Sequence, residues 1–169
     1  MFSLKNYQKD AVDELLANTK RLLGKGWDTK LTFQAPTASG KTIMVAEFLK
    51  NLVTDPSQKK ELSFIWAAPQ KLHNQSKAKL ENYYQDSRVL ECSGFNDLSD
   101  KQIAQNEILF LNWESINKAT NIIVKENERD FYLDKIIENT KDADREIILI
   151  IDESHHTADS DISKKLKEK

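Results

Sequence analysis

The chain has 169 residues, of which 39% are hydrophobic and 31% are charged, a balance that predicts one globular domain and excludes a disordered or fibrous protein. The formal net charge is −2, so binding to nucleic acid would require a local basic patch. The only cysteine, Cys92, excludes an internal disulfide, and the sequence shows neither a signal peptide nor an apolar run of about 20 residues. These features predict a cytoplasmic protein that does not enter a membrane.

Helices and strands are predicted to alternate along the chain. Apolar residues recur with helical spacing from Tyr7 to Leu23, and the following glycines end this helix. Further elements are predicted as strand 31–35, loop 36–40, helix 43–52, strand 62–68, helix 71–84, strands 87–91 and 107–112, helix 130–139 and strand 147–151. Near-continuous apolar strands between helices are typical of an α/β fold with a parallel sheet covered on both faces. In such sheets the ligand lies at the carboxyl ends of the strands.

A phosphate-binding loop is predicted between strand 31–35 and the next helix, with the sequence Ala35-Pro36-Thr37-Ala38-Ser39-Gly40-Lys41-Thr42. The segment from Pro36 to Thr42 would surround a phosphate with successive backbone N–H groups, of which proline itself has none. Lys41 would place a positive charge on the β- and γ-phosphates, and the Thr42 hydroxyl would ligate Mg²⁺. The strict pattern begins with glycine where this chain has Ala35, so an ordinary strand-to-helix turn is the alternative.

Two acidic residues, Asp152 and Glu153, follow the apolar strand 147–151. An unpaired charge at the end of a buried strand is costly, so these carboxylates require a cation. Asp152 would hold Mg²⁺ and Glu153 would orient or deprotonate an attacking water, while a cap at the strand end is the alternative interpretation. Together with the phosphate loop, the acidic pair predicts ATP hydrolysis with Lys41, Asp152 and Glu153 as catalytic residues.

Several segments resemble the motifs of superfamily 2 helicases and stand in the same order. Asp152-Glu153-Ser154-His155-His156 resembles motif II, whose usual forms are DEAD, DEAH or DExH, and Tyr7-Gln8 resembles the motif that reads adenine. Ala68-Pro69-Gln70, with Leu72 and Gln75, resembles motif Ia. The sequence is most similar to the motor domain of restriction-enzyme R subunits, of type III or a related type. This resemblance implies a RecA-like P-loop domain, with a mainly parallel sheet between helices, that binds ATP and Mg²⁺.

The resemblance also implies contacts with DNA. The segment from Phe110 to Ile116 is similar to one that touches the tracked strand in such motors. The contacts with the DNA backbone are implied to lie near Pro69, Gln70, Asn112 and Trp113. The lysines Lys71, Lys77 and Lys79 would supply nearby charge, or would form a solvated helix face. A methyltransferase or specificity subunit is a further implied partner.

The resemblance covers nearly all of the chain but less than half of a two-domain motor. Residues 1–169 correspond to the N-terminal part of the first RecA-like domain, without motif III and without the second domain. In the family the strand that leads to motif III lies between the strands that correspond to 31–35 and 147–151, so a central strand is expected to be missing. The expected consequence is strand exchange, a rearranged sheet or residues without defined positions, and this chain alone is expected to be nearly inactive. The predicted function is an ATP-dependent DNA translocase or helicase. An RNA-directed helicase and a nucleotide-binding module that does not translocate remain alternatives.

Overall fold

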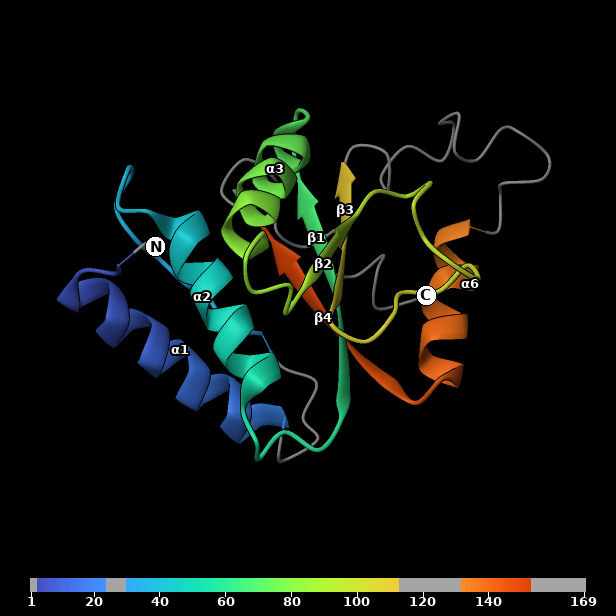
Figure 1. The fold of residues 1–169 in the computed structure, drawn as a ribbon, viewed down its shortest axis with the longest axis horizontal. Coiled ribbons are helices and arrows are strands. Elements are labelled where there is room, and N and C mark those ends of the chain that lie inside the picture. Colours follow the sequence, from blue (N-terminus) through green and yellow to red (C-terminus); the bar gives the residue numbers. More distant parts are fainter. Residues whose placement is uncertain (1–2, 24–29, 113–131, 153–169) are drawn as a thin grey trace. The chain divides into compact units, whose positions relative to one another are not determined.

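The computed structural model describes residues 3–23, 30–112 and 132–152, which Figure 1 draws in colour. The chain divides into two compact units, Met1–Gln58 and Lys59–Lys169. Among the described residues, the first unit contains two helices, and the second contains two helices and four strands. The predicted α/β class is confirmed. In this part of the chain, no helix combines the length and the apolar character that crossing a bilayer requires.

Helices α1 (Asn6–Leu23) and α2 (Lys41–Thr54) form the ordered core of the first unit. They pack against each other, with Val12 of α1 and Met44 of α2 almost completely buried. Their apolar residues recur at the helical spacing that predicted them, so that one face of each helix is covered. Both predicted helices are therefore confirmed.

The predicted strand at residues 31–35 is wrong, because the structure shows irregular chain there. Leu31 is 42% exposed, and the side chains of Thr32 and Gln34 are exposed as well. A strand requires a neighbour with which its backbone amides and carbonyls can pair. Among the described residues, this segment pairs with no other strand. The β-forming composition of the segment is not sufficient without such a neighbour.

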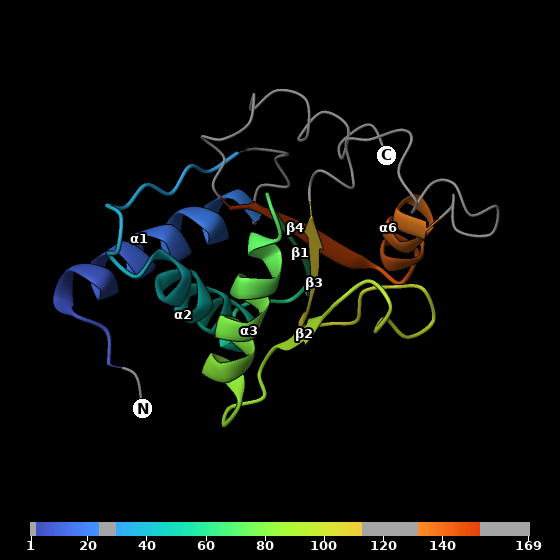
Figure 2. The same ribbon diagram turned by 90° about the horizontal axis from the view of Figure 1, so that it is seen from above.

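The second unit is built on a four-stranded sheet with the order β2-β3-β1-β4 (Figures 1 and 2). The strands are β1 (Glu61–Ala68), β2 (Glu91–Ser93), β3 (Glu107–Asn112) and β4 (Arg145–Ile151). Every pairing between them is parallel, which confirms the predicted sheet. Because parallel strands run in one direction, the carboxyl ends of all four strands lie at the same end of the sheet, called its carboxyl edge below.

Helices α3 (Leu72–Tyr84) and α6 (Tyr132–Asp142) lie on opposite sides of this sheet, as both views show (Figures 1 and 2). Side chains alternate between the faces along each strand. Ile65 of β1 and its register partners, Leu109 of β3 and Leu149 of β4, face α6 and join a cluster of buried residues there. The sheet is thus covered on both faces, as its apolar strands predicted.

The predicted strand at residues 87–91 is wrong in position, since β2 begins only at Glu91. Arg88 has a φ of 49°, in the left-handed region, so the chain cannot be extended there. The Arg88 amide donates a hydrogen bond of 2.8 Å to the Tyr84 carbonyl oxygen. This bond continues the end of α3 into a turn and delays the start of the strand.

Strand β4 is an outer strand of the sheet. It pairs with β1 on one side, and no strand in the described part of the chain pairs with its other edge. All of its residues are half-buried, whereas β1 is almost entirely buried. Such an edge carries backbone groups that can pair with another strand. The expected gap between strand 31–35 and strand 147–151 stays a prediction, because residues 31–35 form no strand.

A hydrogen bond between Lys20 and Asp55 joins the C-terminal ends of α1 and α2, and the pKa of Asp55 reports on it. The Asp55 carboxylate accepts a hydrogen bond of 2.5 Å from the Lys20 ammonium group. It also accepts bonds of 2.5 Å and 2.8 Å from the Ser57 hydroxyl and amide. The Lys20 bond, followed by those from Ser57, lowers the Asp55 pKa from 3.8 to about 2. We expect an NMR titration of this carboxyl to have a midpoint near that value and Lys20→Ala to raise the midpoint.

The folded pKa of Asp55 lies below its unfolded value, so its stabilising contribution is complete above a pH of about 3.8 and is lost as the pH falls toward 2. Lys9→Ala serves as the control, because it removes one positive charge from an exposed position on the same helix. If Lys9→Ala raised the Asp55 midpoint as much as Lys20→Ala, net charge rather than the hydrogen bond would set the pKa.

Candidate nucleotide-binding site

The predicted phosphate loop forms a tight turn that leads into α2. The Ser39 amide donates a hydrogen bond of 3.1 Å to the Pro36 carbonyl oxygen and so closes the turn. Ala38 and Gly40 have φ angles of 61° and 85°, both in the left-handed region. Helix α2 then begins at Lys41. Glycine adopts this conformation at little cost, whereas at Ala38 it costs about 1 kcal/mol or more.

Two features of this turn suit it to bind an anion. Gly40 is the N-cap of α2 and has no side chain with which to cap the first amides of the helix. Those amides carry the positive end of the helix dipole, where phosphate groups bind in many proteins. In addition, the Ser39 hydroxyl oxygen is buried and has no hydrogen-bond partner among the described residues. A buried, unpaired hydroxyl fits a site that is completed by a ligand oxygen.

Tyr7 and Gln8, at the start of α1, contact the phosphate loop through one carbonyl group. Gln8 Nε2 donates a hydrogen bond of 2.8 Å to the Ser39 carbonyl oxygen, and the Tyr7 hydroxyl donates one of 3.2 Å to the same atom. The Lys5 amide donates to Gln8 Oε1 at 2.9 Å and anchors the side chain of Gln8. The structure thus brings the predicted adenine-reading pair to the predicted phosphate loop.

The other predicted nucleotide-binding residues lie on the same turn or in the first turn of α2. Pro36, Thr37 and Ala38 are exposed, whereas Lys41 and Thr42 are half-buried. In a helix each Cα–Cβ bond tilts toward the N-terminus. The side chains of Lys41 and Thr42 therefore start in the direction of the loop, as a role at a bound phosphate requires.

In the second unit, Asp152 directly follows β4, and two hydrogen bonds fix its position. Its amide donates to the Ala67 carbonyl oxygen at 2.9 Å, which continues the β1–β4 pairing past the end of the strand. The Ser76 hydroxyl of α3 donates to Asp152 Oδ2 at 3.2 Å. Ser76 is not among the site residues predicted from the sequence. The sequence does contain a signal for this residue. Ser76 lies four residues before Leu80 and eight before Tyr84, which places a serine on the buried face of α3.

A single carboxylate such as that of Asp152 can take part in a Mg²⁺ site. No group of three or more His, Cys, Asp or Glu side chains in the described residues could hold a metal ion. Mg²⁺ is typically bound through one or two carboxylates, with water and substrate phosphates as its other ligands. A carboxylate has two oxygens, so the hydrogen bond to Asp152 Oδ2 leaves Oδ1 to ligate an ion.

Parallel pairing brings residues implied to contact DNA to the same edge of the sheet as Asp152. Ala68, the last residue of β1, is in register with Asn112, the last residue of β3. Gln70 follows β1 and is exposed. Pro69 itself is buried. A contact with DNA near this position would therefore involve its exposed neighbours.

The turn after β1 has an unusual backbone conformation. Gln70 and Lys71 have φ angles of 49° and 64°, two consecutive left-handed residues that are not glycine. Such conformations cost on the order of 1 kcal/mol or more each and concentrate at functional sites. Lys71 and Lys79 are exposed, whereas Lys77 forms an ion pair with Glu81 on the same helix. Of the three lysines considered for nucleic-acid binding, Lys77 is therefore the one whose charge is already paired on its own helix.

Some predicted site residues lie outside the described part of the chain. These are Glu153, His155 and His156 of the motif II segment and Trp113 of the segment after β3.

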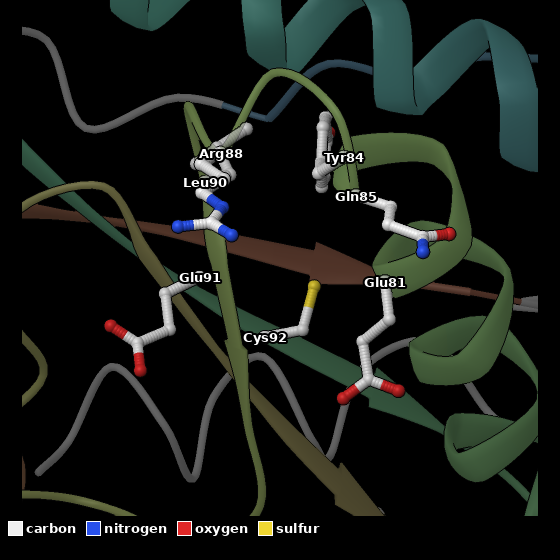
Figure 3. Close-up of a pocket in the computed structure, with 7 residues that line it drawn as sticks. All are labelled: Glu81, Tyr84, Gln85, Arg88, Leu90, Glu91 and Cys92. Carbon is white, nitrogen blue, oxygen red and sulfur yellow. The ribbon is translucent and has the colours of Figure 1, made fainter.

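A cavity of about 400 Å³ lies away from the predicted residues, at the end of α3 and the start of β2 (Figure 3). Figure 3 shows the thiol of Cys92 between the side chains of Glu81 and Glu91. Burial, followed by the nearby charge of Glu81, raises the Cys92 pKa to about 12. The thiol therefore stays protonated near neutral pH and is a poor nucleophile. None of the predicted site residues lines this cavity.

Comparison with known protein families matches residues 1–169 to the family described as "Type III restriction enzyme, res subunit". The match spans the whole chain. No curated protein and no solved structure matches it.

The variant Gly40→Ala tests the geometry of the phosphate loop. A Cβ atom at this position would lie 2.8 Å from Gln8 Nε2, and the φ of 85° is unfavourable for any L side chain. We expect the free energy of unfolding, measured with urea, to fall by about 1–2 kcal/mol. Gly94→Ala is the matched control, because Gly94 is not left-handed and its added Cβ would meet only the Asp97 side chain, at 3.1 Å, whose Oδ2 accepts a hydrogen bond from the Gly94 amide.

The double variant Gln8→Ala/Gly40→Ala separates the two causes, since it removes the close contact but keeps the unfavourable φ. We expect it to recover only part of the stability that is lost in Gly40→Ala, after subtraction of the effect of Gln8→Ala alone. Equal losses in Gly40→Ala and Gly94→Ala would contradict the assignment of a special conformation to Gly40.

Proposed function

Because the chain belongs to the family of type III restriction enzyme res subunits, which are helicase-like ATP-dependent motors, we propose that it binds and hydrolyses ATP to drive movement along DNA. The observation that carries this proposal is the phosphate loop. The buried Ser39 hydroxyl, the left-handed Gly40 and the N-terminus of α2 lie together on one short segment. Their chemistry fits the phosphates of a nucleotide.

Four residues carry the nucleotide chemistry in this proposal. Lys41 adds a positive charge beside the β- and γ-phosphates, and Thr42 and Asp152 ligate Mg²⁺. Glu153 orients or deprotonates the attacking water. When bound, Mg²⁺ neutralises phosphate charge that develops during transfer. The hydrogen bonds at Asp152 support its role, because they hold its carboxylate in one place.

Tyr7 and Gln8 read the adenine base in this proposal. Their hydrogen bonds to the Ser39 carbonyl oxygen support it, because they join the base-reading residues to the loop that holds the phosphates. The Gln8 amide retains hydrogen-bonding capacity for a base, since its NH₂ group has two hydrogens and its oxygen two lone pairs.

DNA binds at the carboxyl edge of the parallel sheet in this proposal, with Gln70, Asn112 and Trp113 at its phosphate backbone. The exposure of Gln70 and Lys71 on a left-handed turn supports the assignment. Contacts with phosphates position a nucleic acid without reading its sequence. A methyltransferase or specificity subunit would then select the DNA site. The protein would act in the cytoplasm, where DNA and ATP are both present.

We propose further that residues 1–169 form the N-terminal part of a first RecA-like domain, and that a second motor domain completes the ATP site. Arginine residues from such a domain stabilise the charge of the transition state in related motors. The edge of β4 that no strand of the described residues occupies supports this arrangement, because an additional strand can pair there. A nucleotide-binding module that does not translocate would show no DNA-stimulated ATP hydrolysis in the two-domain protein.

The variant Lys41→Ala tests the phosphate loop directly. A fluorescent ATP analogue is titrated into the wild-type chain and the variant in the presence of Mg²⁺, after circular dichroism has shown that both are folded. Loss of a charge-assisted contact should cost about 1.5–3 kcal/mol, or roughly 10- to 150-fold in affinity. Lys9→Ala removes the same charge from an exposed site on α1 and should bind like the wild type. Equal affinities for Lys41→Ala and the wild type would contradict the proposal.

The variant Lys71→Ala tests the nucleic-acid edge. Binding of a labelled single-stranded DNA is followed by fluorescence anisotropy over a range of salt concentrations. If Lys71 neutralises one phosphate, the slope of log affinity against log salt should become shallower by roughly 0.7. Lys77→Ala is the control, because Lys77 is paired with Glu81. An unchanged slope in Lys71→Ala would exclude this contact, and tighter binding of an RNA of the same sequence would favour the RNA-directed alternative.

A further inference from the structure

Ser76 occupies a position in α3 where an apolar residue would be expected. It lies on the buried stripe of the helix, spaced by four and eight residues from Leu80 and Tyr84. Only 6% of its surface is exposed, and serine is both a poorer helix former than leucine and costly to bury without a partner. The stability of α3 alone therefore gives no reason for a serine here.

The hydroxyl of Ser76 bonds across the fold rather than within its own helix. Serines inside helices commonly bond to the carbonyl group four residues earlier. Ser76 Oγ instead donates to Asp152 Oδ2 at 3.2 Å, a partner 76 residues away in the sequence. The bond therefore links α3 to the end of β4, at the carboxyl edge of the sheet.

Asp152 is consequently held at two points. Its backbone is fixed by the amide bond of 2.9 Å to the Ala67 carbonyl oxygen, and its side chain is fixed by Ser76. A hydroxyl that donates to one carboxylate oxygen restricts rotation of the group and leaves the other oxygen, Oδ1, in a defined direction. Groups that orient a metal ligand in this way typically contribute 10- to 100-fold to metal affinity.

We propose that Ser76 is a positioning residue that holds the Asp152 carboxylate in the orientation in which Oδ1 ligates Mg²⁺. This inference rests on the proposed function, because it assumes that Asp152 is the Mg²⁺ ligand. Ser76 itself touches neither metal nor nucleotide. It restricts the Asp152 side chain before the ion binds, so that less conformational entropy is lost on binding.

The test compares Ser76→Ala, Ser76→Thr and Asp152→Ala with the wild-type chain. Mg²⁺ is titrated at a fixed concentration of a fluorescent ATP analogue to obtain the half-saturating Mg²⁺ concentration, and binding of the analogue is measured separately in EDTA. We expect Ser76→Ala to raise the half-saturating concentration about tenfold and to leave binding in EDTA unchanged. Ser76→Thr keeps the hydroxyl and should restore the wild-type value to within about threefold, allowing for its additional methyl group.

Ser63→Ala is the matched control. Ser63 is a completely buried serine of the same unit, and its hydroxyl lies 2.9 Å from the Ala104 carbonyl oxygen, near the amino end of β1. The change removes the same atom and a comparable hydrogen bond. We expect it to lower stability without moving the half-saturating Mg²⁺ concentration, so a general loss of packing is distinguished from a loss of positioning.

A double-mutant cycle provides a readout that requires neither nucleotide nor metal. The unfolding free energies of the wild type, Ser76→Ala, Asp152→Ala and the double variant are measured with urea in EDTA. If the two side chains interact, the effects of the single changes should not add. Ser76→Cys, which keeps the size of the side chain but donates weakly, replaces Ser76→Ala in both experiments if the alanine variant does not fold.

The outcomes separate the two proposals. If Asp152→Ala raises the half-saturating Mg²⁺ concentration but Ser76→Ala does not, Ser76 has no positioning role and the proposed function stands. Additive effects in the cycle would likewise overturn the role of Ser76 alone. If Asp152→Ala leaves the Mg²⁺ dependence unchanged, Asp152 is not the ligand, and both the metal assignment and the inference about Ser76 are wrong.

Discussion

The parallel pairing of β1 with β3 and β4 is the constraint on which the geometry of the second unit depends. Parallel hydrogen bonds give all the strands one direction, so that whatever follows β1, β3 and β4 emerges at one edge. The turn at Gln70, the end of β3 at Asn112 and Asp152 after β4 therefore lie at the same end of the sheet, although long stretches of sequence separate them. The bond from the Asp152 amide to Ala67 extends the same pairing by one residue and places the carboxylate.

Buried polar contacts fix the chain between β2 and β3, whose path strand pairing alone does not determine. At the amino end of β3, the Glu107 carboxylate is buried and accepts hydrogen bonds from the Ser93 hydroxyl, at 2.5 Å, and the Ala104 amide, at 2.6 Å. Ser63 lies close to the carbonyl groups of the same loop. These bonds hold the chain between β2 and β3 at the end of the sheet opposite to Asp152. Satisfied polar groups of this kind favour one arrangement of a loop, because an unpaired buried group is costly.

In the first unit the corresponding constraint is the left-handed Gly40. Its conformation turns the chain into α2, and its lack of a side chain leaves space for Gln8, whose amide nitrogen would lie within 2.8 Å of any Cβ there. The loop and the start of α1 thus fit each other without contacts from a nucleotide. A binding site that is already formed loses less conformational entropy when its ligand is bound.

Much of this protein was determined by local sequence. Helical periodicity gave α1, α2 and α3, and apolar runs gave β1, β3 and β4, because these patterns reflect side chains that one face must bury. The predicted phosphate loop and Asp152, the proposed Mg²⁺ ligand, came from residue types at fixed spacing, since phosphate and Mg²⁺ chemistry requires such residues. Tertiary structure decided the rest. Residues 31–35 have a strand-like composition but lack a pairing neighbour, and Arg88 in a left-handed conformation displaced the start of β2. The partner of Ser76 was likewise hidden in the sequence, because a hydrogen bond between residues 76 positions apart depends on how helix and sheet pack and not on any local pattern.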